Sequence, residues 1–160
     1  MEGQNTVSIN DFQIIRKLGQ GTFGSVFIST FKPTGDIVAL KRMKKENATE
    51  SAIIRFRREA RIMKKMSHPA IVQFFGSFET ENSIFIAMEY IDGQTLDRIV
   101  NNTTNSCCDA FCQQDNQLNE VALPENVTMR HFVELLCILK HLHREEKVVH
   151  RDLKLDNLII

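Results

Sequence analysis

The sequence lacks net charge, and it lacks any long apolar run. Its 160 residues include 20 Lys+Arg and 20 Asp+Glu, so the formal net charge is zero at pH 7. This balance argues against a strongly basic nucleic-acid-binding protein and against a polybasic membrane protein. The longest apolar stretches, such as residues 84–88, are far too short to span a bilayer. The first ten residues are polar and show no signal peptide, so we expect a cytoplasmic protein, with access to the nucleus left open.

Cysteine is scarce, and its spacing does not match a common metal site. Cys107, Cys108 and Cys112 cluster in one polar stretch, and Cys137 lies in an apolar helical pattern. These positions form no CxxC pair, so a structural zinc site is the minor alternative. We expect free thiols in a reducing compartment.

The sequence does contain enough apolar residues, 42%, to build a folded core. Alternating and β-branched segments predict five strands, and apolar residues at helical spacing predict helices. A polar stretch at 101–119 predicts a flexible surface loop. The fold class that follows is α+β, with five strands, one helix inserted after the third, and then further helices. The predicted strands are 12–18, 25–30, 37–43, 71–78 and 83–90, and the predicted helices are 51–66, 95–100 and 124–143.

A glycine-rich stretch separates the first two predicted strands. Gly19, Gly21 and Gly24 fit the pattern G-x-G-x-x-G, which is a weak signal by itself. A dinucleotide-binding version would lead into a helix, whereas the residues after Gly24 are typical of a strand, so that interpretation fails. Two other interpretations of the glycines stay open: an ordinary glycine turn, or a hairpin tip whose backbone N–H groups lie over phosphate oxygens.

A lysine and a glutamate are predicted to meet on an inward face. Ala39 and Lys41 project to the same side of their strand, where Ala39 leaves room for a flat ligand. Glu59 lies on the otherwise apolar stripe of the helix 51–66. A carboxylate on an apolar face is costly unless it is paired, and Lys41 is the natural partner. The alternative is an edge lysine that protects the sheet.

The other positions of the same helix are rich in basic residues. Such a run is found in RNA-binding modules, but a solvated outer face is the favoured interpretation because the whole chain is neutral. The basic positions are Arg55, Arg57, Arg58, Arg61, Lys64 and Lys65.

The strongest signal is the run HRDLKLDN at residues 150–157. With the glycine loop, Lys41 and Glu59 in this order, it makes the sequence resemble the eukaryotic protein kinase family. A lysine two places after Asp152 is typical of the serine/threonine branch. The resemblance covers residues 12–160 apart from 101–119. It implies a kinase-like small lobe at 8–92, then a partial, mainly helical large lobe at 93–160 with a polar insertion at 101–119.

The resemblance also implies a set of site residues, with ATP and Mg²⁺ as cofactors. Asp152 would accept the proton of the substrate hydroxyl, Lys154 would steady the transferred phosphoryl group, and Asn157 would hold one Mg²⁺. The expected partners are ATP and a protein that offers a Ser or Thr; no nucleic acid and no membrane are expected, and the oligomeric state is open. The implied nucleotide-binding residues are Leu18, Gly19, Gly21, Gly24, Val26, Ala39, Lys41, Glu59, Met88, Glu89 and Ile91.

One motif of the family, Asp-Phe-Gly, does not occur in the sequence. We therefore expect a kinase truncated after the catalytic loop, which by itself has negligible phosphotransfer activity. The alternative is a catalytically dead ATP-binding or regulatory kinase fragment. An RNA-binding module, resting on the basic helix alone, is the third possibility, and it would require steep salt dependence.

Overall fold

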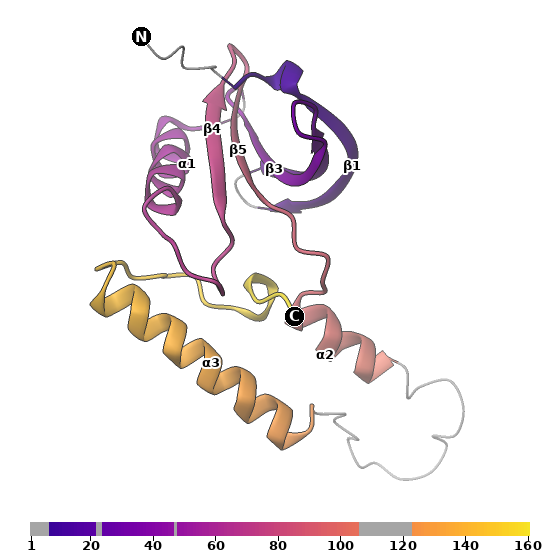
Figure 1. The fold of residues 1–160 in the computed structure, drawn as a ribbon, viewed down its shortest axis with the longest axis vertical. Helices are drawn as coiled ribbons and strands as arrows, with labels where there is room; N and C mark the ends of the chain where they lie inside the picture. Colours follow the sequence, from indigo (N-terminus) through magenta and orange to yellow (C-terminus); the bar gives the residue numbers. More distant parts are fainter. Residues whose placement is uncertain (1–6, 22–23, 47, 106–122) are drawn as a thin grey trace. The chain divides into compact units, whose positions relative to one another are not determined.

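The computed structural model describes residues 7–21, 24–46, 48–105 and 123–160 (Figure 1). The chain divides into two compact units, Met1–Tyr90 and Ile91–Ile160. The cysteine cluster at 107–112 lies outside the described residues. Within the described ranges, no helix is both long enough and apolar enough to cross a bilayer.

The first unit is built on a five-stranded antiparallel sheet, as the sequence predicts. Its strands follow the order β1-β2-β3-β5-β4, so the last strand in the chain lies between β3 and β4. A short 3-10 turn, η1 (Ile9–Asp11), precedes the sheet. The strands are β1 (Phe12–Gly21), β2 (Gly24–Phe31), β3 (Asp36–Lys44), β4 (Phe74–Glu79) and β5 (Ser83–Glu89).

One helix, α1 (Glu50–Met63), connects β3 to β4 and packs on the sheet (Figure 1). It begins at the N-cap Thr49, whose side chain accepts a hydrogen bond from the Ala52 N–H. The prediction that it continues to residue 66 is wrong by one turn. The N–H groups of Lys65 and Met66 bond to carbonyls three residues back, so the chain tightens into a turn after Met63.

The strand predicted at 71–78 is also displaced. The Ile71 N–H bonds to the His68 carbonyl, which closes a turn around Pro69, and β4 begins only at Phe74. The preference of Ile71 and Val72 for strands is overridden by this turn.

Apolar residues form two separate clusters, one on each face of the sheet. On one face Phe12, Val38, Leu40, Phe85 and Ala87 are buried together. On the other face α1 inserts Phe56 and Ala60 against the sheet. The sheet residues that they contact are Met43, Ile84 and Ile86.

The second unit contains α2 (Leu96–Asn105), α3 (Glu125–Arg144) and the 3-10 turn η2 (Leu155–Asn157). The loop predicted at 101–119 does not begin at 101, because α2 continues to Asn105; residues 106–119 lie outside the described ranges. The Asn101 amide donates to the Asp97 carboxylate at 3.1 Å, one helical turn away, which supports this extension. Pro124 precedes the first helical residue of α3 rather than being that residue.

Candidate functional site

The strand register places four of the implied nucleotide-binding residues on one face of the sheet. Val26 lies opposite Lys41 across β2 and β3, and Ala39 lies opposite Met88 across β3 and β5. Directly opposed residues of antiparallel strands project to the same side, and so do residues two apart on one strand. This is also the face on which α1 packs, since Met43 continues the alternation from Ala39 and Lys41.

Lys41 and Glu59 form an ion pair across this face. The Lys41 Nζ lies 2.6 Å from the Glu59 Oε1, and the two side chains are 21% and 37% exposed. The ammonium also lies 5.5 Å from the centre of the Phe56 ring. Phe56 is 1% exposed and anchors α1, so it fixes the helix turn from which Glu59 reaches the strand. The lysine is therefore held in one direction by a carboxylate and an aromatic face.

The glycines of the β1–β2 hairpin fall into two kinds. Gly24 has a φ of 140°, and a Cβ there would collide with the Arg42 carbonyl oxygen, so the fold itself requires glycine. Gly19 is different, because a Cβ there would meet no described atom within 4 Å. At Gly21 the nearest such atom is 3.9 Å away. Among the described residues, no steric contact requires glycine at these two positions.

Side-chain hydrogen bonds close the same hairpin from its flank. The Gln20 Oε1 accepts from the Ser25 hydroxyl at 2.7 Å and from the Lys17 ammonium at 2.6 Å. Leu18, which precedes the first glycine, is half-buried. Residues 22–23 at the tip lie outside the described residues.

Glu89, at the end of β5, is tied to the segment before β4. Its N–H donates to the Gln73 carbonyl at 2.9 Å, and its carboxylate accepts from the Gln73 N–H at 3.2 Å. Because the N–H is used, any adenine contact from Glu89 would be made through its carbonyl oxygen. Ile91, the other residue implied at this edge, belongs to the second unit and is exposed.

In the second unit, the three implied catalytic and metal-binding residues lie together. The Asn157 amide nitrogen donates to the Asp152 carbonyl at 2.7 Å and to the Asp152 carboxylate at 3.0 Å. The Lys154 Nζ lies 3.6 Å from the same carboxylate, and the Asp152 side chain is 68% exposed. Arg151 has a φ of 65°, in the left-handed region that non-glycine residues rarely adopt. The loop thus presents an accessible carboxylate beside an ammonium and an amide.

The donor set is compatible with magnesium bound mainly through phosphate. Since its nitrogen is directed at Asp152, the Asn157 side chain has its oxygen left as a ligand, and magnesium prefers oxygen ligands. Among the described residues no cluster of three or more His, Cys, Asp or Glu side chains is arranged to hold a metal. A site built from one or two protein oxygens and substrate phosphates is the usual magnesium arrangement.

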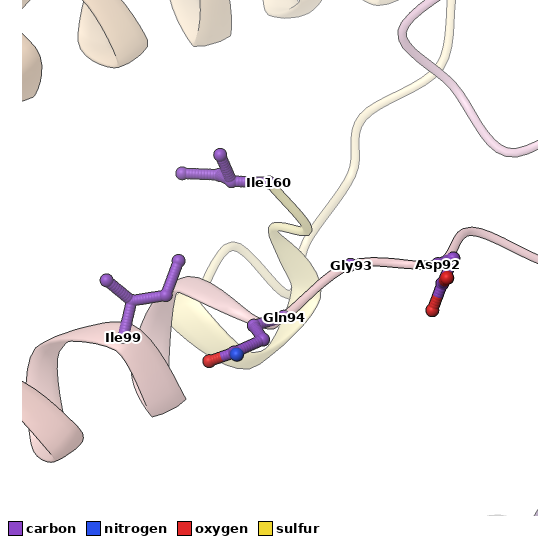
Figure 2. Close-up of a pocket in the computed structure, with 5 residues that line it drawn as sticks. All are labelled: Asp92, Gly93, Gln94, Ile99 and Ile160. Atoms are coloured by element: carbon purple, nitrogen blue, oxygen red, sulfur yellow. The ribbon is translucent and has the colours of Figure 1, made fainter.

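The segment after η2 pairs with the start of α2. Ile160 and Gln94 exchange two backbone hydrogen bonds, at 3.0 and 3.1 Å, and the Leu96 N–H donates to the Leu158 carbonyl at 2.8 Å. A Cβ on Gly93 would approach the Ile160 oxygen to 2.7 Å, so this pairing requires glycine there. A hollow of about 470 Å³ lies beside this pairing, and none of the implied site residues lines it. Figure 2 shows the residues that do. They are Asp92, Gly93, Gln94, Ile99 and Ile160.

A second ion pair on α1 was not identified from the sequence. The Arg57 guanidinium donates to both carboxylate oxygens of Glu79, at 2.7 and 2.9 Å. The hydrogen bond from Arg57, with help from Lys45, lowers the pKa of Glu79 to about 2, and the same bond raises the pKa of Arg57. The sequence shows Arg57 only as a basic residue on an outward helix face, where many carboxylates could pair with it. The fold selects Glu79 as the partner.

Comparison with known proteins agrees with this geometry. Residues 12–160 match the family model described as the protein kinase domain. The chain is 34% identical, over 98% of its length, to "Probable serine/threonine protein kinase IREH1" of Arabidopsis thaliana, and it spans 11% of that protein. It is 29% identical over 95% of its length to "Serine/threonine-protein kinase nekl-2" of Caenorhabditis elegans, of which it spans 41%. It is 28% identical over 95% of its length to human "Serine/threonine-protein kinase Nek5", of which it spans 19%.

The chain therefore covers less than half the length of each of these relatives. The family model nevertheless matches nearly the whole of the chain, from the first strand to the last residue. The resemblance inferred from the sequence motifs is confirmed: the chain belongs to the protein kinase family, and its relatives are of the serine/threonine type.

Proposed function

We propose that residues 12–160 are the nucleotide-binding and catalytic-loop part of a protein serine/threonine kinase. The reaction is transfer of the ATP γ-phosphoryl group to a Ser or Thr hydroxyl of a protein. The observation that carries this proposal is the Lys41–Glu59 pair at 2.6 Å, on the sheet face that also holds Val26 and Ala39. A lysine so paired is directed at phosphate rather than left to solvent.

In this proposal the sheet face and the hairpin bind ATP. The adenine ring lies against Val26, Ala39 and Met88, and the Glu89 carbonyl accepts from its amino group. The phosphates lie beside Gly19 and Gly21, where an added Cβ would meet no described atom closer than 3.9 Å. Lys41 binds the phosphate oxygens by charge-assisted hydrogen bonds, which are about twice as strong as neutral ones. Ile91 and the catalytic loop belong to the second unit.

The catalytic loop positions the substrate hydroxyl and its proton. Asp152 accepts this proton, and the hydrogen bond from Asn157 holds its carboxylate in place. Lys154 supplies positive charge next to the transferred phosphoryl group. Asn157 would also offer an oxygen to Mg²⁺, which when bound neutralises phosphate charge. Transfer of this kind depends on positioning and electrostatics, which these side chains can provide.

We also propose that the 160 residues bind Mg-ATP without appreciable transfer when tested alone. They contain no Asp-Phe-Gly triplet, whose aspartate is a magnesium ligand in this family. A kinase fragment whose role is to bind ATP or to regulate a partner is the second candidate, and binding of Mg-ATP without transfer would favour it.

Two measurements on the 160-residue chain test the proposal. Isothermal titration with Mg-ATP should show binding that is weakened about tenfold or more in Lys41→Met. Transfer of labelled phosphate to a generic protein substrate should be close to background. Transfer well above background that disappears in Asp152→Asn would support the kinase activity and overturn the expectation of an inactive chain. Binding that is equal in the wild type and in Lys41→Met would overturn the nucleotide site.

A further inference from the structure

Two ion pairs hold helix α1 on the sheet, and the helix supplies the carboxylate in one and the cation in the other. On one side its Glu59 pairs with Lys41 of β3, and on the other its Arg57 pairs with Glu79 of β4. The strand β5 lies between β3 and β4, so the helix spans one strand and is tied to both neighbours of that strand. Two strand spacings are about 10 Å, close to the diameter of a helix with its side chains.

The positions of the two pairs on the helix oppose rotation. Residues two apart in an α-helix are separated by about 200°, so Arg57 and Glu59 emerge on opposite flanks. Between these flanks lie Phe56 and Ala60, which are buried against the sheet. Rotation of the helix about its axis in either direction would lengthen one of the two pairs. The apolar contacts alone would resist rotation less, because they are not directional.

Glu79 lies at the centre of the second of these ion pairs, the one with Arg57. Its carboxylate accepts two bonds from Arg57 and lies 3.0 Å from the Lys45 Nζ. Lys45 also donates to the Thr80 carbonyl at 2.8 Å, so the chain leaving β3 is fixed to the same point. The Glu79 side chain is 35% exposed, and a bidentate pair within such a network has a more defined geometry than an isolated surface pair.

We propose that Glu79 is a positioning residue for the nucleotide site. By fixing Arg57 and Lys45, it holds α1 in the rotation that brings Glu59 to Lys41. Glu79 itself does not touch ATP. The expected change in ATP affinity rests on the proposed function. The dependence of the Lys41–Glu59 pair on Glu79 does not, because it can be measured without ATP.

The test uses the 160-residue chain and the variants Glu79→Gln, Arg57→Gln and their double. Two matched controls remove one charge nearby: Glu81→Gln, in the β4–β5 turn, and Arg58→Gln, the exposed neighbour on α1. The first measurement, without nucleotide, is the rate at which acetic anhydride acylates the Lys41 amine, followed by peptide mass spectrometry. The second measurement is the dissociation constant for Mg-ATP. A melting temperature is recorded for every variant.

We expect Lys41 acylation to rise about two- to fivefold in each single variant, the size expected for a solvated ion pair. The Mg-ATP dissociation constant should rise by a similar factor, because a smaller fraction of the chain is competent to bind. The double variant should show no further change, since both substitutions break one interaction. The controls should match the wild type.

A lowered melting temperature with unchanged Lys41 acylation would show a merely structural role and would overturn the proposal. If Glu79→Gln does not fold, Arg57→Lys takes its place; it keeps the charge, loses the bidentate geometry and should give a smaller rise in acylation. Unchanged acylation in that variant would also overturn the proposal. Absence of Mg-ATP binding by the wild type, with acylation still dependent on Glu79, would instead overturn the proposed function and leave the positioning role supported.

Discussion

The Lys41 ammonium and the Glu59 carboxylate lie 2.6 Å apart, although 18 positions separate them in the chain. One is on a central strand and the other on α1, the only α-helix in the described part of the first unit. The pair exists because Phe56, one helical turn before Ala60, anchors α1 on Met43, Ile84 and Ile86. Burial of these apolar side chains sets the height and the direction of the helix, and the ion pair then fixes its rotation.

Loss of the Lys41 ammonium should weaken ATP binding by about tenfold or more. Hydrogen bonds to charged groups contribute about 1.5–3 kcal/mol, and 1.4 kcal/mol corresponds to a factor of ten in affinity. Lys41→Met tests this in a titration with Mg-ATP, and Glu59→Gln should give a smaller loss because the ammonium remains. Lys44→Met, which removes an exposed charge from the same strand, is the control. An affinity in Lys41→Met equal to that of the control would contradict the assignment.

Two glycine substitutions in the hairpin should differ in their effect on stability. Gly24→Ala forces a Cβ towards the Arg42 carbonyl and an unfavourable positive φ, so we expect a loss of about 1–3 kcal/mol. Gly19→Ala meets no described atom within 4 Å and should change the free energy of unfolding by less than about 0.5 kcal/mol. Urea denaturation measures both. Equal losses in the two variants would show that the hairpin has a different backbone geometry.

The stabilising effect of Glu79 should disappear in acid. Its pKa is lowered to about 2 in the folded chain by the hydrogen bond from Arg57, whereas a glutamate in an unfolded chain titrates near 4.3. A lowered folded pKa stabilises the fold above the unfolded pKa, and this effect is lost as the pH falls through the folded pKa. The difference in melting temperature between the wild type and Glu79→Gln should therefore be full above about pH 5 and shrink towards pH 2.

The matched control for this pH series is Glu81→Gln. It removes a carboxylate two residues away for which no interaction with α1 is described, and its difference from the wild type should stay small at every pH. A difference for Glu79→Gln that is constant from pH 6 to pH 2 would mean that the carboxylate does not pair with Arg57 in solution.

Asn157→Ala should loosen the catalytic loop without affecting the first unit. The variant removes both hydrogen bonds from the amide to Asp152, and about 1 kcal/mol is typical for each such bond. We expect faster hydrogen exchange at the Asn157 and Leu158 amides, whose bonds to Lys154 and Leu155 close the η2 turn. Exchange in β3 should be unchanged. Unaltered exchange across residues 152–158 would show that the amide does not order this loop.

Much of the site could be predicted because its residues are close together in the sequence or have only one plausible partner. The run at 150–157 is contiguous, so its residues meet through a few backbone turns, as the bonds between Asn157 and Asp152 show. Glu59 could be matched to Lys41 because a carboxylate on an apolar helix stripe needs a partner, and few cations lie on inward faces. The five strands followed from period-two patterns, which reflect side-chain alternation.

Other features depended on neighbours that the sequence does not specify. The helix α1 ends at Met63 because the Lys65 and Met66 N–H groups bond three residues back and tighten the chain into a turn. The strand β4 begins only at Phe74 because a separate turn around Pro69 uses Ile71, whose own preference favours a strand. The α2 helix continues to Asn105, through polar residues that the composition predicts to form a loop.

By itself, then, the sequence determined the family, the alternation of strands and the grouping of Asp152, Lys154 and Asn157 in one loop, because these depend on residue type and short spacing. The tertiary structure alone decided that Arg57 pairs with Glu79, and that β5 separates the strands to which α1 is tied. An outward arginine can satisfy its charge with any nearby carboxylate, so its partner is selected only when the strand order brings one side chain within reach.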